Sequence, residues 1–399
     1  MSAFNKALCM RWCFLQRTIS NTGEKFQPLE NVIREKLIPA IVGRKVSDVE
    51  RRMLALPIRH GGLGIQNPTK TAQIEYETST HVTRNLTALI QNQEQNLDNY
   101  NLDMVKAEIA KLHAEKERRL VNEFESVKAL VSENLHRSLD QATEKGSGAW
   151  LAALPIQSLG YVLNKNEFRD GIALRYGWKI PNTPFHCSCG EKNDVDHTLN
   201  CKLGGYVSMR HNAIRDLEAN LLREVCKDVK TEPELIPIGN IEMHGKTGDQ
   251  ARPDVSAVGV WSSMERTFLD VCIIHPNSPS YRDKTPASLY KTHECKKKNA
   301  YNDRILQVEK GSFTPLIFST YGGMGPECTK YHKRLAELIA NKRNESYADV
   351  MNFIRTKIRF SILKCTLVAI RGERGKKRNQ TSTSDVSLNT VPTTSDYEA

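Results

Sequence analysis

The 399-residue sequence predicts a mixed α+β or α/β protein, with helices at its N-terminal end and a mixed sheet flanked by helices towards its C-terminal end. Three observations support this fold class. Residues 101–145 contain neither proline nor glycine, and their apolar residues recur every three or four positions, as on one face of a helix. A cluster of cysteine and histidine lies between residues 187 and 201. From about 232 to 325, short apolar runs alternate with turn residues, a pattern typical of strands.

Composition narrows the classes of partner. Lys and Arg number 57 against 46 Asp and Glu, a net charge of +11, which favours a polyanion such as nucleic acid, with an anionic membrane surface second. No run reaches the roughly 18 apolar residues that span a bilayer, and Lys6 and Arg11 interrupt the first segment, unlike a signal peptide. We therefore expect an intracellular, nuclear protein whose partner is DNA and, as a second candidate, RNA, with no membrane partner.

The N-terminal segment, residues 1–95, reads as helices broken by a turn. "LPIRHGGLGIQNP", residues 56–68, carries Pro57, Pro68 and three glycines, which exclude regular structure there. Residues 96–180 follow as long amphipathic helices, with a hinge at "EKGSGAW" (144–150) and a further helix at "NEFRDGIALRYGW" (166–178). The long apolar face serves as a packing face or a connector between domains; the alternative is a coiled-coil dimer.

Residues 181–205 contain Cys187, Cys189, His197 and Cys201 in the pattern C-x-C-x7-H-x3-C. Three thiolates and an imidazole are ligands of tetrahedral Zn²⁺, and a site closed by four protein ligands is structural, not catalytic. The sequence therefore predicts a CCHC zinc knuckle. Ordinary unliganded thiols are the alternative, because the C-x-C spacing is tighter than usual.

Residues 206–370 are expected to form the domain with the sheet. The predicted strands lie in "LIPIGNI" (235–241), "DVSAVGV" (254–260), "RTFLDVCII" (266–274) and "TPLIFSTYGG" (314–323). One lysine-rich helix, residues 288–310, interrupts them, and helices return at 329–370. Residues 371–399 have the polar composition of a disordered tail. The run Lys376–Arg378 within it fits a solvated tail better than a nuclear localisation signal.

Two aspartates stand at the predicted strands. Asp254 begins one strand and Asp270 lies in the next, so a hairpin turning near Ser262–Ser263 would bring both carboxylates to the same end of a sheet. Two carboxylates plus water suit Mg²⁺, which can activate water for attack on a phosphodiester. The lysine-rich helix supplies Lys297 and Lys298, with Tyr301 one helical turn away. Solvated strand-end aspartates are the alternative.

Two other motifs are excluded. "GNIEMHGKT", residues 239–247, has five residues between its glycines where a phosphate-binding loop has four, and no helix follows it. "YADV", residues 347–350, has Val350 in place of the second aspartate of a polymerase pair and lies in helical sequence. The chain therefore carries no reverse-transcriptase or nucleotide-hydrolysing site.

A set of motifs in this order resembles a known family. The motifs are "GAWLAALP", the CCHC cluster, "RHNAIRDL", "ARPDVSA", "FLDV", the lysine-rich helix and "GSFTPLIFSTYGGMG". The family is the PD-(D/E)xK restriction-like endonuclease region at the C-terminal end of non-long-terminal-repeat retrotransposon polyproteins. The resemblance covers roughly residues 145–370. "ERRMLALPIRHGGLGI" looks like the stretch after the polymerase palm, which identifies the first segment as a thumb or connector remnant.

The resemblance implies roles for the acidic pair. Asp254 matches the Asp of PD and Asp270 the second acidic position, while Cys272 stands where the simple motif has its lysine. Related enzymes carry that lysine on a following helix, which favours Lys298 and then Lys297. A helix before the sheet often supplies another carboxylate, for which Glu218 is available.

The implied function is metal-dependent DNA cleavage, with structural Zn²⁺ in the knuckle and catalytic Mg²⁺ on Asp254 and Asp270. A catalytically inactive nucleic-acid-binding protein or a decayed element fragment is the main alternative. A scaffold built on the long helix is a further one. The geometry of the two carboxylates and a lysine separates an enzyme from a binding protein.

Overall fold

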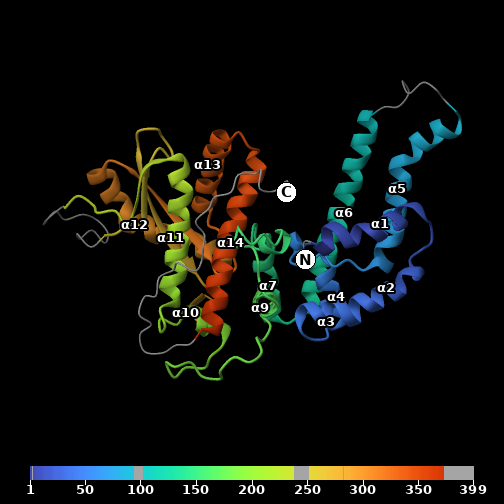
Figure 1. Cartoon of the computed structure of the whole chain (residues 1–399), viewed down its shortest axis with the longest axis horizontal. Helices are drawn as coiled ribbons and strands as arrows, with labels where there is room; N and C mark the ends of the chain where they lie inside the picture. The colour runs from blue at the N-terminus through green and yellow to red at the C-terminus, as the bar shows by residue number, and fades with distance from the viewer. Residues whose placement is uncertain (2, 94–101, 238–250, 282, 373–399) are drawn as a thin grey trace. The chain divides into compact units, whose positions relative to one another are not determined.

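The computed structural model describes residues 1, 3–93, 102–237, 251–281 and 283–372, and the chain divides into two compact units (Figure 1). The first comprises Met1–Thr143 and Arg175–Trp178, and the second comprises Glu144–Leu174 and Lys179–Ala399. The segment 1–95 lies in the first unit, the segments 181–205 and 206–370 lie in the second, and the segment 96–180 is shared between them.

The described part of the first unit is helical, as the sequence predicted. Its helices are η1 (Phe4–Leu8), α1 (Cys9–Thr18), η2 (Glu24–Phe26), α2 (Gln27–Val32), η3 (Ile33–Leu37), α3 (Ile38–Val42), α4 (Asp48–Ala55), η4 (Ile58–His60), α5 (Pro68–Gln91), α6 (Leu102–Leu130) and α7 (Glu133–Thr143). Helix α4 begins at a capping box formed by Ser47 and Glu50, in which two otherwise unpaired backbone N–H groups are satisfied.

The glycine-rich turn between α4 and α5 is confirmed. A Cβ on Gly62 would lie 1.9 Å from the carbonyl oxygen of Leu56, so only glycine allows this close approach of two backbone segments. Leu63 and Ile65, which are fully buried, both donate backbone hydrogen bonds to the carbonyl of Leu54. The turn is therefore a packed structural element of the first unit.

The second unit is mixed α+β, which confirms the expected class. Its helices are α8 (Ala149–Ala152), α9 (Lys165–Arg175, whose last residue belongs to the first unit), α10 (Val195–Asn200), α11 (Tyr206–Val225), η6 (Pro279–Tyr281), α12 (Pro286–Arg304), η7 (Ile305–Glu309), α13 (Pro326–Arg343) and α14 (Tyr347–Arg371). Its strands are β1 (Lys227–Thr231), β2 (Val255–Val258), β3 (Arg266–Ile274) and β4 (Ser312–Ser319). Residues 347–350 lie in α14, so the helical interpretation of "YADV" is correct.

The strands form one mixed sheet in the order β1-β2-β3-β4. Strands β1, β2 and β3 are antiparallel neighbours, whereas β3 and β4 are parallel and are connected through α12. The predicted β2–β3 hairpin is confirmed. Strand β1 was not predicted, because "KDVKT" is polar and mostly exposed. Residues 235–237 were expected in a strand and are not in one, and residues 238–241 of the same run lie outside the described residues.

Helices pack against both faces of this sheet (Figure 1). Along β3, Leu269 and Val271 contact a core formed with α11, α13 and α14. Phe268 and Ile274, which point to the opposite face because side chains alternate along a strand, pack with residues of α12 and η7. Asp270 and Cys272 share the parity of Phe268, so they face α12.

No described helix is long and apolar enough to cross a membrane. The tail interpretation of residues 371–399 falls almost wholly on residues 373–399, which lie outside the described residues, as do Lys376–Arg378 and the sequence "GNIEMHGKT".

Candidate metal centre and carboxylate site

The four predicted zinc ligands meet in the second unit. One donor atom from each of Cys187, Cys189, His197 and Cys201 lies within 4.8 Å of the others. The Sγ atoms of Cys187 and Cys201 are 3.8 Å apart, and the Sγ atom of Cys189 is 3.2 Å from Nε2 of His197. Sulfur ligands about 2.3 Å from a tetrahedral ion are separated by about 3.7 Å. The donor set therefore fits a metal ion such as Zn²⁺.

A short turn and a short helix present these ligands. Gly190, with φ of 95°, closes the turn that carries Cys187 and Cys189, and its N–H donates to the carbonyl of Cys187. Asp194 caps α10 by accepting a hydrogen bond from the His197 N–H. The N–H of Cys201, directly after α10, donates to the carbonyl of His197. Local hydrogen bonds thus position all four ligands.

The electrostatics of the cluster suit metal binding. Burial opposes ionisation of the Cys187 thiol, but hydrogen bonds from the Cys189 backbone and from His197 outweigh it and lower the pKa of Cys187 to about 6. Cysteine binds a metal as the thiolate, so the environment favours the binding form at Cys187, whereas burial raises the pKa of Cys201.

The knuckle, residues 181–205, is attached to the end of β3 by buried polar contacts. His275, whose side chain is fully buried, lies with Nε2 2.9 Å from Oδ1 of Asp196 and Nδ1 2.8 Å from Oγ1 of Thr320. The Asn200 amide donates to Oγ of Ser278 at 2.8 Å. Because Asp196 directly precedes the ligand His197, these contacts hold the cluster against the end of β3.

Asp254 and Asp270 flank the last residue pair of the β2–β3 hairpin. The register pairs Val255 with Leu269; Asp254 directly precedes Val255, and Asp270 directly follows Leu269. The Asp254 N–H donates to the carbonyl of Leu269, so the regular register ends before Asp254. Both aspartates therefore lie at the end of the hairpin away from its turn, as expected.

The carboxylate of Asp254 is held by two groups. Its Oδ2 accepts a hydrogen bond from the Val271 N–H at 2.6 Å and lies 3.1 Å from Nε2 of His211 on α11. The same His211 nitrogen is 3.1 Å from the carbonyl oxygen of Val271. Because β2 begins only at Val255, it offers no backbone partner to Val271. The side chains of Asp254 and His211 contact the N–H and the carbonyl of Val271 instead. The hydrogen bond to Asp254 raises the pKa of His211.

Asp270 is buried and paired with a lysine. Its side chain is 4% exposed, and its Oδ2 lies 2.6 Å from Nζ of Lys297 on α12. Burial raises the pKa of Asp270 to about 6, although the positive charge of Lys297 opposes the shift. Nζ of Lys297 also lies 5.8 Å from the ring centre of Tyr301. Lys297 and Tyr301 are four residues apart, so they share one face of the helix.

Lys298 does not join this pair. Its Nζ lies 2.8 Å from Oε1 of Glu327 on α13. The sequence favoured Lys298 over Lys297 as the lysine beside the aspartates, and this geometry shows that preference to be wrong. One residue of an α-helix turns the side chain by about 100°, so adjacent lysines face different neighbours. Leu289, His293, Lys297, Tyr301 and Ile305 recur every four residues, a signal that identifies Lys297 as the sheet-facing lysine.

Glu218 also lies elsewhere. It is fully buried in the core on α11, where its Oε1 is 2.8 Å from Nε2 of His332. It pairs with α13 and does not extend the aspartate pair. Conversely, sequence reasoning missed His211, which contacts Asp254. His211 stands three residues before the buried Ile214, a spacing that places both on the sheet-facing side of α11.

Cys272 occupies the lysine position of the simple motif. Its side chain faces α12, with Sγ 3.9 Å from Nδ1 of His293, and burial raises the pKa of its thiol to about 11. It is therefore a neutral thiol at ordinary pH. The cation beside Asp270 comes from α12, through Lys297.

The two aspartates form a smaller set of ligands than the knuckle. Within the described ranges, the Cys187 cluster is the one group of three or more His, Cys, Asp or Glu side chains close enough to share an ion. Mg²⁺ is usually held by one or two carboxylates, with water and substrate phosphate completing its shell.

Comparison with models of known protein families gives no match, and comparison with curated proteins gives none either. What the site does must therefore follow from its own residues.

Proposed function

We propose that the second unit is a metal-dependent DNA endonuclease derived from a retrotransposon polyprotein, of the PD-(D/E)xK type that the sequence resembles. One observation carries the proposal. Asp254 and Asp270 flank the last residue pair of a hairpin, and the Lys297 ammonium is 2.6 Å from Asp270. Two carboxylates and a lysine are the functional groups that this type of nuclease requires, and they come from separate parts of the sequence.

The fold of this unit is compatible with the proposal. A mixed sheet has helices on both faces, and the proposed site lies where the hairpin ends beside α12. Strands β3 and β4 and the connecting helix α12 form a rigid support, which is needed because catalytic groups must be held within a fraction of an ångström.

Each residue has a distinct role in this proposal. Asp254 and Asp270 would hold Mg²⁺, which when bound would supply a Lewis acid for phosphodiester cleavage. Lys297 would hold the Asp270 carboxylate ionised and donate a hydrogen bond to the attacking water or to the phosphate. Tyr301 limits the rotation of Lys297 through its ring. His211 and the Val271 N–H orient Asp254.

The knuckle serves the same unit as a structural element. Zn²⁺ held by Cys187, Cys189, His197 and Cys201 would stabilise a short loop that has few apolar contacts of its own. Together with the net charge of +11, a knuckle fixed to the sheet supports DNA as the partner, because cationic side chains bind phosphate without regard to sequence.

Nicking of supercoiled plasmid by the full chain tests this function. Wild-type protein should nick the plasmid with Mg²⁺ and not with excess chelator. Asp254→Ala should abolish nicking and leave DNA affinity nearly unchanged, because the carboxylate serves the metal and repels phosphate in its absence. Asp349→Ala, an exposed aspartate at the start of α14, is the matched control and should remain active.

Equal trace activity in wild type and Asp254→Ala would identify a contaminating nuclease and reject the endonuclease. A second function would then stand, that of a nucleic-acid-binding protein without catalysis. One observation favours it: Asp254 and Asp270 each already have a partner within the protein, respectively the Val271 N–H and Lys297. Duplex binding without Mg²⁺-dependent cleavage is the expected result for that alternative.

A further inference from the structure

The first unit contains a groove between α1, α4, α5 and α6 that the proposed nuclease does not use. Its volume is about 1070 Å³, which exceeds a typical small-molecule pocket. Helices α5 and α6 form a pair that extends from this unit (Figure 1). The groove follows their facing sides, so it is elongated along two helices.

The floor of the groove is aliphatic. Helix α5 contributes Ile74 and Val82, and α6 contributes Ile109, Leu112 and Leu120. These residues are spaced so that they form one stripe on each helix. The groove lining contains no Phe, Tyr or Trp, and its one aromatic ring is the imidazole of His113, so it offers little surface on which successive nucleic-acid bases could stack.

The rim of the groove is charged and keeps a net positive charge. Of the seven Arg and Lys side chains that line the groove, Arg51 is buried against Glu30, and five of the other six pair with Glu75, Glu115, Glu117 or Glu123. Several basic groups reach solvent, since the side chains of Arg17, Lys116 and Arg119 are more than half exposed. The seven cations are Arg17, Arg51, Arg52, Arg59, Lys70, Lys116 and Arg119, and the three carboxylates of the lining are Glu75, Glu115 and Glu123.

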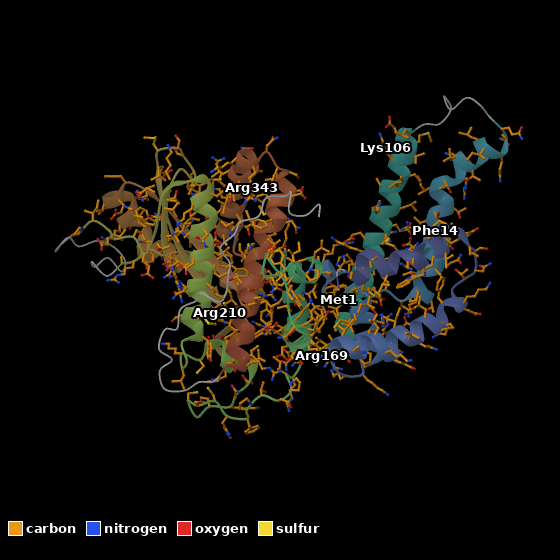
Figure 2. The ribbon with its side chains drawn as sticks, in the orientation of Figure 1. Met1, Phe14, Lys106, Arg169, Arg210 and Arg343 are labelled. Carbon is orange, nitrogen blue, oxygen red and sulfur yellow. The ribbon has the colours of Figure 1, made fainter. Side chains whose placement is uncertain are left out.

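Exposed apolar side chains continue beyond the groove along the same two helices. Ile90 on α5 is 68% exposed and Met104 on α6 is 66% exposed, and Leu86 and Leu102 are also exposed. Phe14, on α1, is 67% exposed (Figure 2). Exposed apolar side chains beside an apolar groove are typical of an interaction site.

We propose that this groove binds an amphipathic helix of a partner protein, one with an aliphatic stripe flanked by Asp and Glu. The aliphatic floor matches the stripe and the basic rim matches the acidic flanks, which is the helix-in-groove mode of recognition. The glutamates of the rim and the lack of Phe, Tyr and Trp in the lining disfavour nucleic acid. A second copy of this chain fits poorly, because two basic rims would face each other.

A pair of synthetic helical peptides tests the occupant with the full-length chain. Each fluorescein-labelled peptide has about 18 residues, roughly 27 Å as a helix, with Leu and Ile on one stripe and either Glu or Lys on the flanks. The Glu-flanked peptide should bind at least about tenfold more tightly than the Lys-flanked one. It should also bind more tightly than a scrambled peptide of the same composition, which keeps the charge and loses the stripe.

Substitutions in the groove test the location. Val82→Asp and Leu112→Asp place a charge on the half-buried floor and should each weaken binding of the Glu-flanked peptide by about tenfold or more. Thr80→Asp, an exposed residue of α5 outside the groove, adds the same charge and should leave binding unchanged. Circular dichroism of each variant establishes that α5 and α6 still fold.

Four results would overturn this inference. Equal affinity for the Glu-flanked and scrambled peptides would reduce the binding to net charge. Equal effects of Val82→Asp and Thr80→Asp would place the peptide elsewhere. A dimer in sedimentation that Val82→Asp dissociates would assign the groove to a second copy of the chain, and displacement of the peptide by a single-stranded oligonucleotide would assign it to nucleic acid.

Discussion

Asp254 and Asp270 differ in how the protein holds each carboxylate. Asp254 accepts a hydrogen bond from a backbone N–H and lies at hydrogen-bonding distance from His211. Asp270 lies deeper, and its burial raises its pKa to about 6 despite Lys297. A carboxylate in such a place is costly unless a cation neutralises it. Lys297 supplies that cation, and a metal ion would supply a second one during cleavage.

Replacement of the two adjacent lysines separates their roles. Lys297→Ala should lower the Mg²⁺-dependent nicking rate by roughly a hundredfold or more, as removal of a donor aimed at developing charge does elsewhere. Lys298→Ala removes the same charge from the same helix, but it breaks only the pair with Glu327, so its rate should stay close to wild type. Single-turnover nicking rates measure both. An inactive Lys298→Ala variant together with an active Lys297→Ala variant would contradict the geometry.

The burial of Glu144 should make the stability of the second unit depend on pH. Both its oxygens accept from the Tyr290 hydroxyl, at 2.9 and 3.0 Å, and burial raises its pKa to about 7. Between its ordinary pKa, about 4.5, and about 7, the folded state keeps a proton that the unfolded chain releases. The free energy of unfolding therefore falls as pH rises through that range, by roughly 3 kcal/mol at most.

Glu144→Gln should remove this dependence. The variant should match wild type near pH 5 and be more stable at about pH 8, because a neutral amide carries no charge to bury. Hydrogen-exchange protection of α12 and β4, compared between the two proteins at each pH, measures the difference. Glu337→Gln, an exposed residue of α13, is the control. If hydrogen-exchange protection changed equally in wild type and Glu144→Gln between the two pH values, Glu144 would not be the group responsible.

Among the elements, α10 connects the metal centre to the sheet. It carries His197 and is capped by Asp194, while Asp196 on the same helix contacts the buried His275 after β3. Burial lowers the pKa of His275, although Asp196 opposes the shift. Since the helix has only six residues, its own hydrogen bonds contribute little stability. Its position depends on the Cys187 cluster at one side and on His275 at the other.

Zinc removal should therefore loosen more than the knuckle. Purified protein should contain one zinc per chain, and chelation should raise hydrogen exchange across residues 185–205 and at residues 274–278 after β3. Cys189→Ser should lose the metal, whereas Cys295→Ser, which replaces another exposed free cysteine, should retain it. Elemental analysis and hydrogen exchange measure these outcomes. Protein isolated without chelator that contains no zinc would exclude the site.

For the molecule as a whole, the charge distribution predicts how it binds DNA. The net charge of +11 should give duplex binding that is largely independent of sequence, because each Lys or Arg contact with phosphate releases counterions. Affinity should fall steeply between about 50 and 200 mM salt. Fluorescence anisotropy with two unrelated duplexes of equal length measures both properties. A flat salt response would mean that electrostatic contacts do not dominate recognition.

Short-range patterns in the sequence were sufficient for several features. Helical spacing predicted the long helices, the C-x-C-x7-H-x3-C spacing predicted the cluster at residues 187–201, and two apolar runs separated by a turn predicted the β2–β3 hairpin. Each feature depends on residues within about thirty positions of one another, so local geometry alone establishes it.

Other features depended on packing between distant segments. Strand β1 forms although its residues are polar, because β2 supplies the backbone partners. Glu218 pairs with His332, 114 positions away. Lys297 and not Lys298 reaches Asp270, because the packing of α12 against β4 fixes the rotation of the helix about its axis, and one residue of rotation changes which lysine faces the sheet. His211 reaches Asp254 because α11 crosses the end of β2. Spacing shows which residues share one face of a helix, but which residue of another element that face contacts depends on how the elements are stacked.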